Sequence, residues 1–278
     1  MKTIFWRMMM YILWGMPAGM PFFYMLLYWL FAPLLWCAQW FYGAGMCIVR
    51  CWHLRSAYRA HVPLIIVGNL TAGGVGKSVF VQTLLSWISA YHAVVVMRGY
   101  GGSFARQRRP RLVEINRHSP YEVGDEAFAL ACKRKALVVV GGDKRQSVEY
   151  AQTLPGVRCI ILDDGYQSWG IARDINIVLL DGRAPFGNRC LIPMGSLREK
   201  SLTRASHVVV THAYAVPVEK RERLKKRIAR YANGRKVPVF WAEHVVNGVY
   251  RSNSQRLAAT QYHQVPVDVV VGIGEPAG

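Results

Sequence analysis

Charged residues are missing from a long N-terminal stretch: between Met8 and Val49 there is no Asp, Glu, Lys or Arg. About 20 apolar residues are enough to cross a bilayer as a helix, and this stretch is longer. It is too long for a signal peptide and lacks a clear small-residue cleavage site, which argues against removal of the segment. We expect a membrane helix from Phe22 to about Trp40, interrupted or kinked near Pro33. The alternative is a buried core helix of a soluble protein.

Basic residues flank this apolar segment. Arg50, Arg55 and Arg59 follow it closely, and the positive-inside rule then places the next part of the chain on the cytoplasmic side. Lys2 and Arg7 precede the segment and weaken that assignment. The sequence fits both a helix that spans the bilayer and a helix that lies in one leaflet.

Acidic residues are scarce. The sequence has 16 Asp and Glu against 35 Lys and Arg, which gives a formal charge of +19. Such a charge favours nucleic acid, acidic lipid headgroups or phosphorylated substrates as partners. The most basic stretch is an expected helix from Val218 to Tyr231, which lacks the interleaved aromatic residues of a nucleic-acid surface. We expect a solvated or membrane-facing surface there and no nucleic-acid partner.

Cysteine motifs are also missing. None of the six cysteines forms a CxxC pair or a Cys/His metal spacing, which excludes a recognisable zinc site. We expect reduced, packed thiols in a cytosolic setting. The six are Cys37, Cys47, Cys51, Cys132, Cys159 and Cys190.

From residue 62 onward, short apolar runs alternate with segments of helical periodicity. This βαβ alternation predicts an α/β fold with a mostly parallel sheet and helices on both faces. In such folds the active site lies at the carboxyl ends of the strands. The expected strands are 62–67, 93–97, 136–140, 159–164, 175–180, 207–211 and 267–271, and the expected helices are 79–91, 127–134, a segment from about 145 to 154, and 218–231.

A glycine-rich loop lies between the first of these strands and the helix after it. Its glycines let the backbone approach phosphate oxygens, and its lysine and serine suit the β/γ-phosphates and Mg²⁺. One position departs from the usual spacing, because Thr71 stands where a P-loop normally has glycine. The expected nucleotide-binding residues are Thr71, Ala72, Gly73, Gly74, Val75, Gly76, Lys77 and Ser78.

Carboxylates follow several predicted strands. Asp163 and Asp164 end one strand and suit a cation site, although Asp164 could instead cap the next turn. Asp181, in an Asp-Gly pair, favours a turn. Asp125 and Glu126 precede a helix, where either acid could cap it or act as a general base toward an alcohol.

Three arginines follow strands or turns and could bind transferring or substrate phosphate: Arg98, Arg145 and Arg198. For each of them taken alone, a surface salt bridge is an equal alternative.

The ordered set of motifs resembles the tetraacyldisaccharide 4′-kinase family, the lipid A 4′-kinases of Gram-negative bacteria. The resemblance extends over nearly the whole chain, and it is specific because of the order of its parts. Those parts are the apolar N-terminus and residues 67–78, 98–102, 124–126, 163–167, 173–174, 186–188, 193–199 and 272–276.

This resemblance implies ATP- and Mg²⁺-dependent phosphorylation of the 4′-hydroxyl of a tetraacylated glucosamine disaccharide 1-phosphate. It places the protein at the cytoplasmic face of the bacterial inner membrane, with membrane lipids as contacts and no protein partner inferred. It implies Asp125 and Lys77 as catalytic residues, and Ser78, Asp163 and Asp164 at the metal. Its implied substrate contacts are Arg98, Glu126, Arg145 and Arg198.

The resemblance also divides the chain into domains. We expect a membrane-associated segment at 1–60, a P-loop kinase core at 61–205 and the start of a smaller α/β domain at 206–278. Members of the family continue past the Gly272–Pro276 turn with an Asp-His motif, and the sequence ends at Gly278 before such a motif. The second domain is therefore expected to be incomplete, and the activity of this chain uncertain.

Two other functions fit parts of the sequence. One is a membrane-anchored P-loop ATPase or switch, but such proteins usually carry a signature lysine near the start of the loop. Here the loop is entered through Asn69, Leu70 and Thr71, and its first lysine is Lys77. The other is an inactive, truncated kinase homologue that keeps the fold and has lost the reaction.

Overall fold

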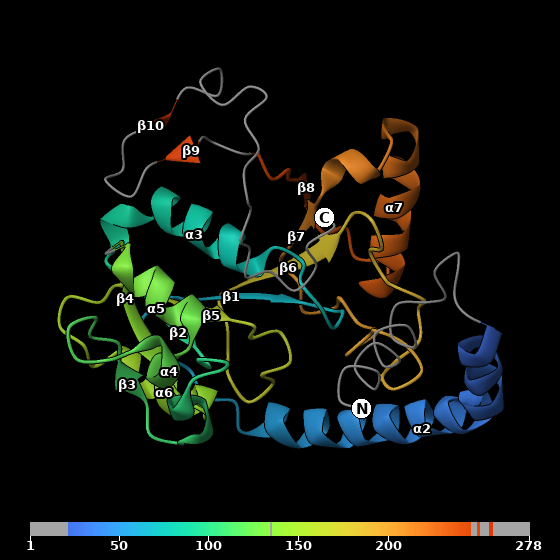
Figure 1. Cartoon of the computed structure of the whole chain (residues 1–278), viewed down its shortest axis with the longest axis horizontal. Coiled ribbons are helices and arrows are strands. Elements are labelled where there is room, and N and C mark those ends of the chain that lie inside the picture. The colour runs from blue at the N-terminus through green and yellow to red at the C-terminus, as the bar shows by residue number, and fades with distance from the viewer. Residues whose placement is uncertain (1–21, 134, 246–248, 251–255, 258–278) are drawn as a thin grey trace.

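The computed structural model describes residues 22–133, 135–245, 249–250 and 256–257. The strand predicted at 267–271 and the motif at 272–276 lie outside these residues. Figure 1 shows a sheet with helices on both sides and one long helix, α2, running beside it.

Helix α2, Phe22–Arg55, is longer than predicted, because it continues past Trp40 to Arg55. It also continues through Pro33, and Figure 1 shows it bent in its N-terminal part. Its stretch Leu30–Arg55 is long and apolar enough to cross a membrane. Of the most apolar 18 residues in that stretch, only 6% are buried in the protein. Such exposure argues against the alternative of a buried core helix.

The sheet has eight strands in the order β3-β4-β2-β5-β1-β6-β7-β8. All neighbouring strands are parallel except β3, which pairs antiparallel with β4. The predicted α/β class with a mostly parallel sheet is therefore confirmed. The strands are β1 Leu64–Asn69, β2 Ala93–Met97, β3 Arg111–Leu112, β4 Leu137–Val140, β5 Cys159–Asp163, β6 Ile175–Asp181, β7 His207–Thr211 and β8 Val239–Trp241; β9 Val249–Tyr250 and β10 Arg256–Leu257 form a separate pair.

Alternating side chains of the strands face two layers of helices. Val67 and Val95 point into the layer that holds Leu85 of α3 and Leu130 of α5. Ile66 and Val96 point to the opposite face, where Val148 of α6 packs. The remaining helices are α3 Lys77–Trp87, α4 Pro120–Val123, α5 Asp125–Cys132, α6 Lys144–Ala151 and α7 Val218–Tyr231, with 3-10 turns at Ser89–Tyr91, Ser103–Arg106 and Ala213–Ala215.

Strands β7 and β8 belong to residues that we expected to open a second domain. Both pair within the single large sheet, β7 with β6 and β8 with β7. Helix α7 packs Leu224 and Ile228 against β6 and β7. Most residues beyond 245 lie outside the described part, so a second domain there stays a prediction.

The cysteines differ from the expectation of packed thiols. Cys159 is buried and Cys190 is partly buried, but Cys37, Cys47, Cys51 and Cys132 are exposed. Three of the exposed cysteines lie on α2. The expectation was wrong for these residues because the surface of α2 faces away from the core.

Candidate active site

The glycine-rich loop connects β1 to α3, as predicted. Gly76 is the N-cap of α3 and has a φ of 78°, which L side chains rarely adopt. The Lys77 ammonium donates to Asn69 Oδ1 at 3.2 Å and lies 3.4 Å from Asp164. The first N–H groups of α3 have no helical partner and, with the helix dipole, favour a bound anion.

Asp164 is surrounded by cationic groups. Its carboxylate lies 3.4 Å from the Lys77 ammonium and accepts from the Arg198 guanidinium at 3.0 Å, while the Lys144 ammonium donates to its backbone carbonyl. Burial acts to raise the pKa of Asp164, but the charges of Lys77, Lys144 and Arg198 outweigh it and hold the pKa below the usual range. Asp164 is therefore ionised and partnered without a metal ion.

Asp163 has a different environment although it is the adjacent residue. Its side chain is buried, and among the described residues its Oδ1 atom has no hydrogen-bond partner. Burial raises its pKa to about 6, with the charge of Lys77 opposing that shift. An unpartnered buried carboxylate oxygen is what a divalent cation would satisfy.

These residues fit a magnesium ion better than a metal held by protein ligands alone. No group of three His, Cys, Asp or Glu side chains in the described residues could hold a metal. Mg²⁺ usually takes one or two carboxylates and completes its shell with water and substrate phosphates. Asp163 could supply the carboxylate and Ser78 the hydroxyl.

The pKa of Asp163 predicts an unusual stability profile in the absence of divalent cations. The folded pKa of about 6 lies above the ordinary value of 3.8, so folding disfavours the charged form and stability falls as pH rises through about 6. In EDTA at pH 8, Asp163→Asn should be more stable than the parent by on the order of 2–3 kcal/mol. The gain should shrink toward pH 4, which thermal denaturation at both pH values will measure; a variant less stable at pH 8 would contradict it.

Helix α5 brings Asp125 and Glu126 to the same end of the sheet. Glu126 Oε1 accepts from the Ser78 hydroxyl at 3.1 Å, which ties α5 to α3. Gly124, at φ 89°, passes so close to the loop after β2 that an added Cβ would lie 2.5 Å from the Tyr100 carbonyl. The close contact between Gly124 and the loop after β2 fixes the start of α5. Asp125, the first residue of α5, is exposed there.

A cavity of about 760 Å³ opens beside Asp164 and is strongly basic. Arg98 and Arg198 both line it. Arg145 lies elsewhere: its side chain packs over the Tyr58 ring and pairs with Glu149 at 2.9 Å. The other cations of this cavity are Arg106, Arg108 and Lys144.

A second, apolar cavity of about 580 Å³ adjoins the basic one and is lined largely by α2. Met46, Trp169 and Arg198 line both cavities. The apolar cavity is further bordered by Trp40, Gly43, Ala44, Cys47, Lys200 and Ser201. A basic site thus meets an apolar one at the helix.

Sequence reasoning missed some residues of the site. Lys144 was passed over for its neighbour Arg145, although the Asp143 side chain caps α6 by accepting from the Arg145 and Gln146 N–H groups. That N-cap signal could have shown which residue opens the helix and faces the site. Asp181 accepts from the Arg183 backbone and side chain, in agreement with the turn that its Asp-Gly pair favours.

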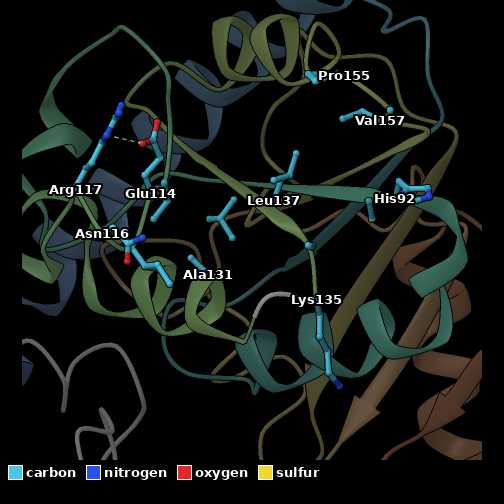
Figure 2. A pocket seen from close by; sticks show the side chains of 15 residues that line it. His92, Glu114, Asn116, Arg117, Ala131, Lys135, Leu137, Pro155 and Val157 are labelled. Carbon is cyan, nitrogen blue, oxygen red and sulfur yellow. Dashed lines mark ion pairs between the residues drawn. The ribbon is translucent and has the colours of Figure 1, made fainter.

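Another cavity, of about 700 Å³, lies at the opposite edge of the sheet. Figure 2 shows it between His92, which precedes β2, and Leu137, the first residue of β4. It therefore lies at the amino ends of these strands, whereas Lys77, Asp163 and Asp164 lie at or after the carboxyl ends of β1 and β5. We assign it no part in the site.

Comparison with known proteins gives consistent results. A family model described as tetraacyldisaccharide-1-P 4′-kinase matches residues 31–278. The tetraacyldisaccharide 4′-kinase of Aeromonas salmonicida is 33% identical over 258 residues, which cover 89% of this chain and 66% of the relative. That of Gluconacetobacter diazotrophicus is 41% identical over 146 residues, covering 52% and 43% respectively. The matched parts thus span about two fifths to two thirds of the length of these curated relatives.

Among solved structures, LpxK from Aquifex aeolicus in complex with ATP has a similar fold. Its TM-score is 0.64 at 24% sequence identity, and the match covers 81% of this chain and 69% of that one. This likeness confirms the P-loop kinase fold of the chain.

Proposed function

This chain belongs to the tetraacyldisaccharide-1-phosphate 4′-kinase family, and from that premise we propose that it phosphorylates the 4′-hydroxyl of a tetraacylated glucosamine disaccharide 1-phosphate with ATP. This reaction is a step of lipid A biosynthesis. The observation that carries the proposal is the meeting of three features at one edge of the sheet. They are the phosphate loop with Lys77, the basic cavity beside Asp164, and the apolar cavity against α2.

The two adjoining cavities match the two parts of such an acceptor. Its 1-phosphate is anionic and suits the cavity lined by Arg98, Lys144 and Arg198. Its acyl chains are apolar and suit the cavity that α2 borders. Each buried CH₂ contributes about 0.8 kcal/mol, so a lipid with four acyl chains stays in the bilayer and the enzyme has to reach it there.

Membrane contact through α2 follows from the same argument. The outward face of the helix carries exposed Leu34, Phe41, Ile48 and Trp52. We propose that this face inserts into the cytoplasmic leaflet of the inner membrane. The inward face is occupied by the protein, which favours a helix lying in one leaflet over one that crosses the bilayer on its own.

Each polar group then has a role in phosphoryl transfer. Lys77 and the N–H groups at the start of α3 bind the phosphates, and Ser78 and Asp163 would hold Mg²⁺. The bound ion would neutralise charge on the phosphate oxygens. Asp125 accepts the proton of the acceptor hydroxyl, Glu126 orients Ser78, and Arg198 keeps Asp164 in place.

Phosphate transfer to defined acceptors tests this function. The full chain in detergent micelles, with labelled ATP and Mg²⁺, should phosphorylate the disaccharide 1-phosphate and leave unlabelled a disaccharide that already carries the 4′-phosphate. EDTA should abolish the transfer. ATP hydrolysis without acceptor labelling would instead identify a P-loop ATPase, and labelling of both acceptors would contradict the assigned position.

A further inference from the structure

Helix α2 presents one stripe of side chains to the rest of the protein. Between Leu30 and Arg50, the partly or fully buried positions recur at helical spacing, and Gln39 is the most buried of them. Their neighbours on the other side of the helix are exposed. The described part of α2 from residue 30 onward therefore has a lipid-accessible face and a face that contacts protein. The inward positions include Ala32, Leu35, Gln39, Tyr42, Met46 and Arg50.

The inward face of α2 contacts residues 190–199, which we call the Arg198 segment. The Leu191 N–H donates to Gln39 Oε1 at 3.3 Å, and the Tyr42 hydroxyl donates to the Arg198 carbonyl at 3.1 Å. Arg50 lies 4.0 Å from the carboxylate of Glu199. In Figure 1 the yellow and gold loops after β6 lie between the sheet and α2, where these contacts occur.

The opposite side of the same segment holds the phosphate loop. The Ala72 N–H donates to the Ser196 carbonyl at 2.7 Å, and the Arg198 N–H donates to the Leu70 carbonyl at 2.7 Å. The Arg198 guanidinium donates to Asp164, which in turn pairs with Lys77. One residue, Arg198, thus contacts α2, the strand-to-loop junction and the carboxylate beside the phosphate site.

We propose that Tyr42 is a positioning residue for phosphoryl transfer, acting through Arg198. This inference rests on the proposed function. The backbone of Arg198 is held by two hydrogen bonds on opposite sides, its N–H by Leu70 and its carbonyl by Tyr42. Contact with the bilayer fixes the position of α2. The Tyr42 hydroxyl then holds the Arg198 backbone at a fixed distance from the helix, and the Arg198 guanidinium orients Asp164.

The size of the effect follows from the single bond involved. A neutral hydrogen bond contributes about 1 kcal/mol, which corresponds to about 5-fold in a rate, and a small misplacement of reacting groups costs more. We expect Tyr42→Phe to lower kcat about 5- to 20-fold. Binding to vesicles should not change, because the hydroxyl points to the protein and away from the lipid-facing side.

A double-mutant cycle tests the pathway through Arg198. Phosphate transfer is measured in micelles for the full chain, Tyr42→Phe, Arg198→Ala and the double variant. Tyr42→Phe should have no further effect once Arg198 is Ala. Fully additive losses would overturn the proposal, because Tyr42 would then act independently of Arg198. Tyr91→Phe, at an exposed tyrosine after α3, is the matched control and should behave as the parent.

Amide hydrogen exchange gives a second readout that does not depend on activity. In Tyr42→Phe, peptides covering residues 191–198 should exchange severalfold faster than in the parent, while α6 peptides should not change. Unchanged exchange at 191–198 would overturn the positioning role. If the parent chain transfers no phosphate, the proposed function fails, and the exchange experiment still decides the role of Tyr42.

Discussion

Asp125→Asn is expected to lower the rate of phosphate transfer by about 10²–10⁴-fold, the range that general bases contribute. The amide has nearly the same size as the carboxylate but cannot take the proton of the acceptor hydroxyl. Because Asp125 is exposed at the start of α5 and outside the phosphate loop, ATP affinity should stay within about 2-fold of the parent. Single-turnover phosphate transfer and binding of a fluorescent nucleotide measure the two quantities.

A matched carboxylate on another helix serves as the control for Asp125. Glu149 on α6 pairs with Arg145, outside the cavities of the site, so Glu149→Gln should transfer phosphate as the parent does. Near-normal turnover in Asp125→Asn would remove Asp125 from the reaction. A large loss of nucleotide binding in the same variant would mean that Asp125 supports the loop and not the acceptor.

Lys77→Ala is expected to reduce both phosphate transfer and nucleotide binding. Removing one preorganised charge from a phosphate site costs about 10²–10³-fold in rate. The fold should survive, because Asp164 keeps its bond to Arg198 at 3.0 Å when the lysine is removed. The contrast with Asp125→Asn separates the residue that we propose binds phosphate from the one that we propose activates the acceptor.

Lys225 on α7 offers a control with the same change in charge. It pairs with Glu222 on its own helix, and neither residue lines the basic or the apolar cavity. Lys225→Ala should leave both measurements unchanged. Phosphate transfer that persists in Lys77→Ala would contradict a P-loop mechanism, whatever the family of the chain.

Much of the core could be predicted because its residues allow few alternatives. The run Ala93–Met97 is entirely apolar and β-branched at its centre, and β2 has those bounds. His207–Thr211 and Val218–Tyr231 were likewise predicted at the observed bounds. Strand β8, Val239–Trp241, was not predicted, because a run of three residues is too short to show the alternation of apolar and polar residues that identifies a strand.

The sequence could not show which of two adjacent polar residues faces the candidate site. Asp163 and Asp164 are the same residue type, yet within the described part of the chain Asp163 is buried with an unpartnered oxygen, whereas Asp164 pairs with two cations. Lys144 and Arg145 differ in the same way, because the phase of α6 points one to the site and the other to Tyr58. Burial and helix phase are properties of the packed chain.

The sequence by itself determined the α/β class, the phosphate loop, the family and the apolar N-terminal helix. Each of these depends on local order along the chain: a strand before a glycine loop, or a long run without charge. The tertiary structure alone decided that α2 packs Tyr42 against Arg198, more than 150 residues later, at 3.1 Å. Contacts between distant segments depend on how the layers pack, and no periodicity within one segment encodes them.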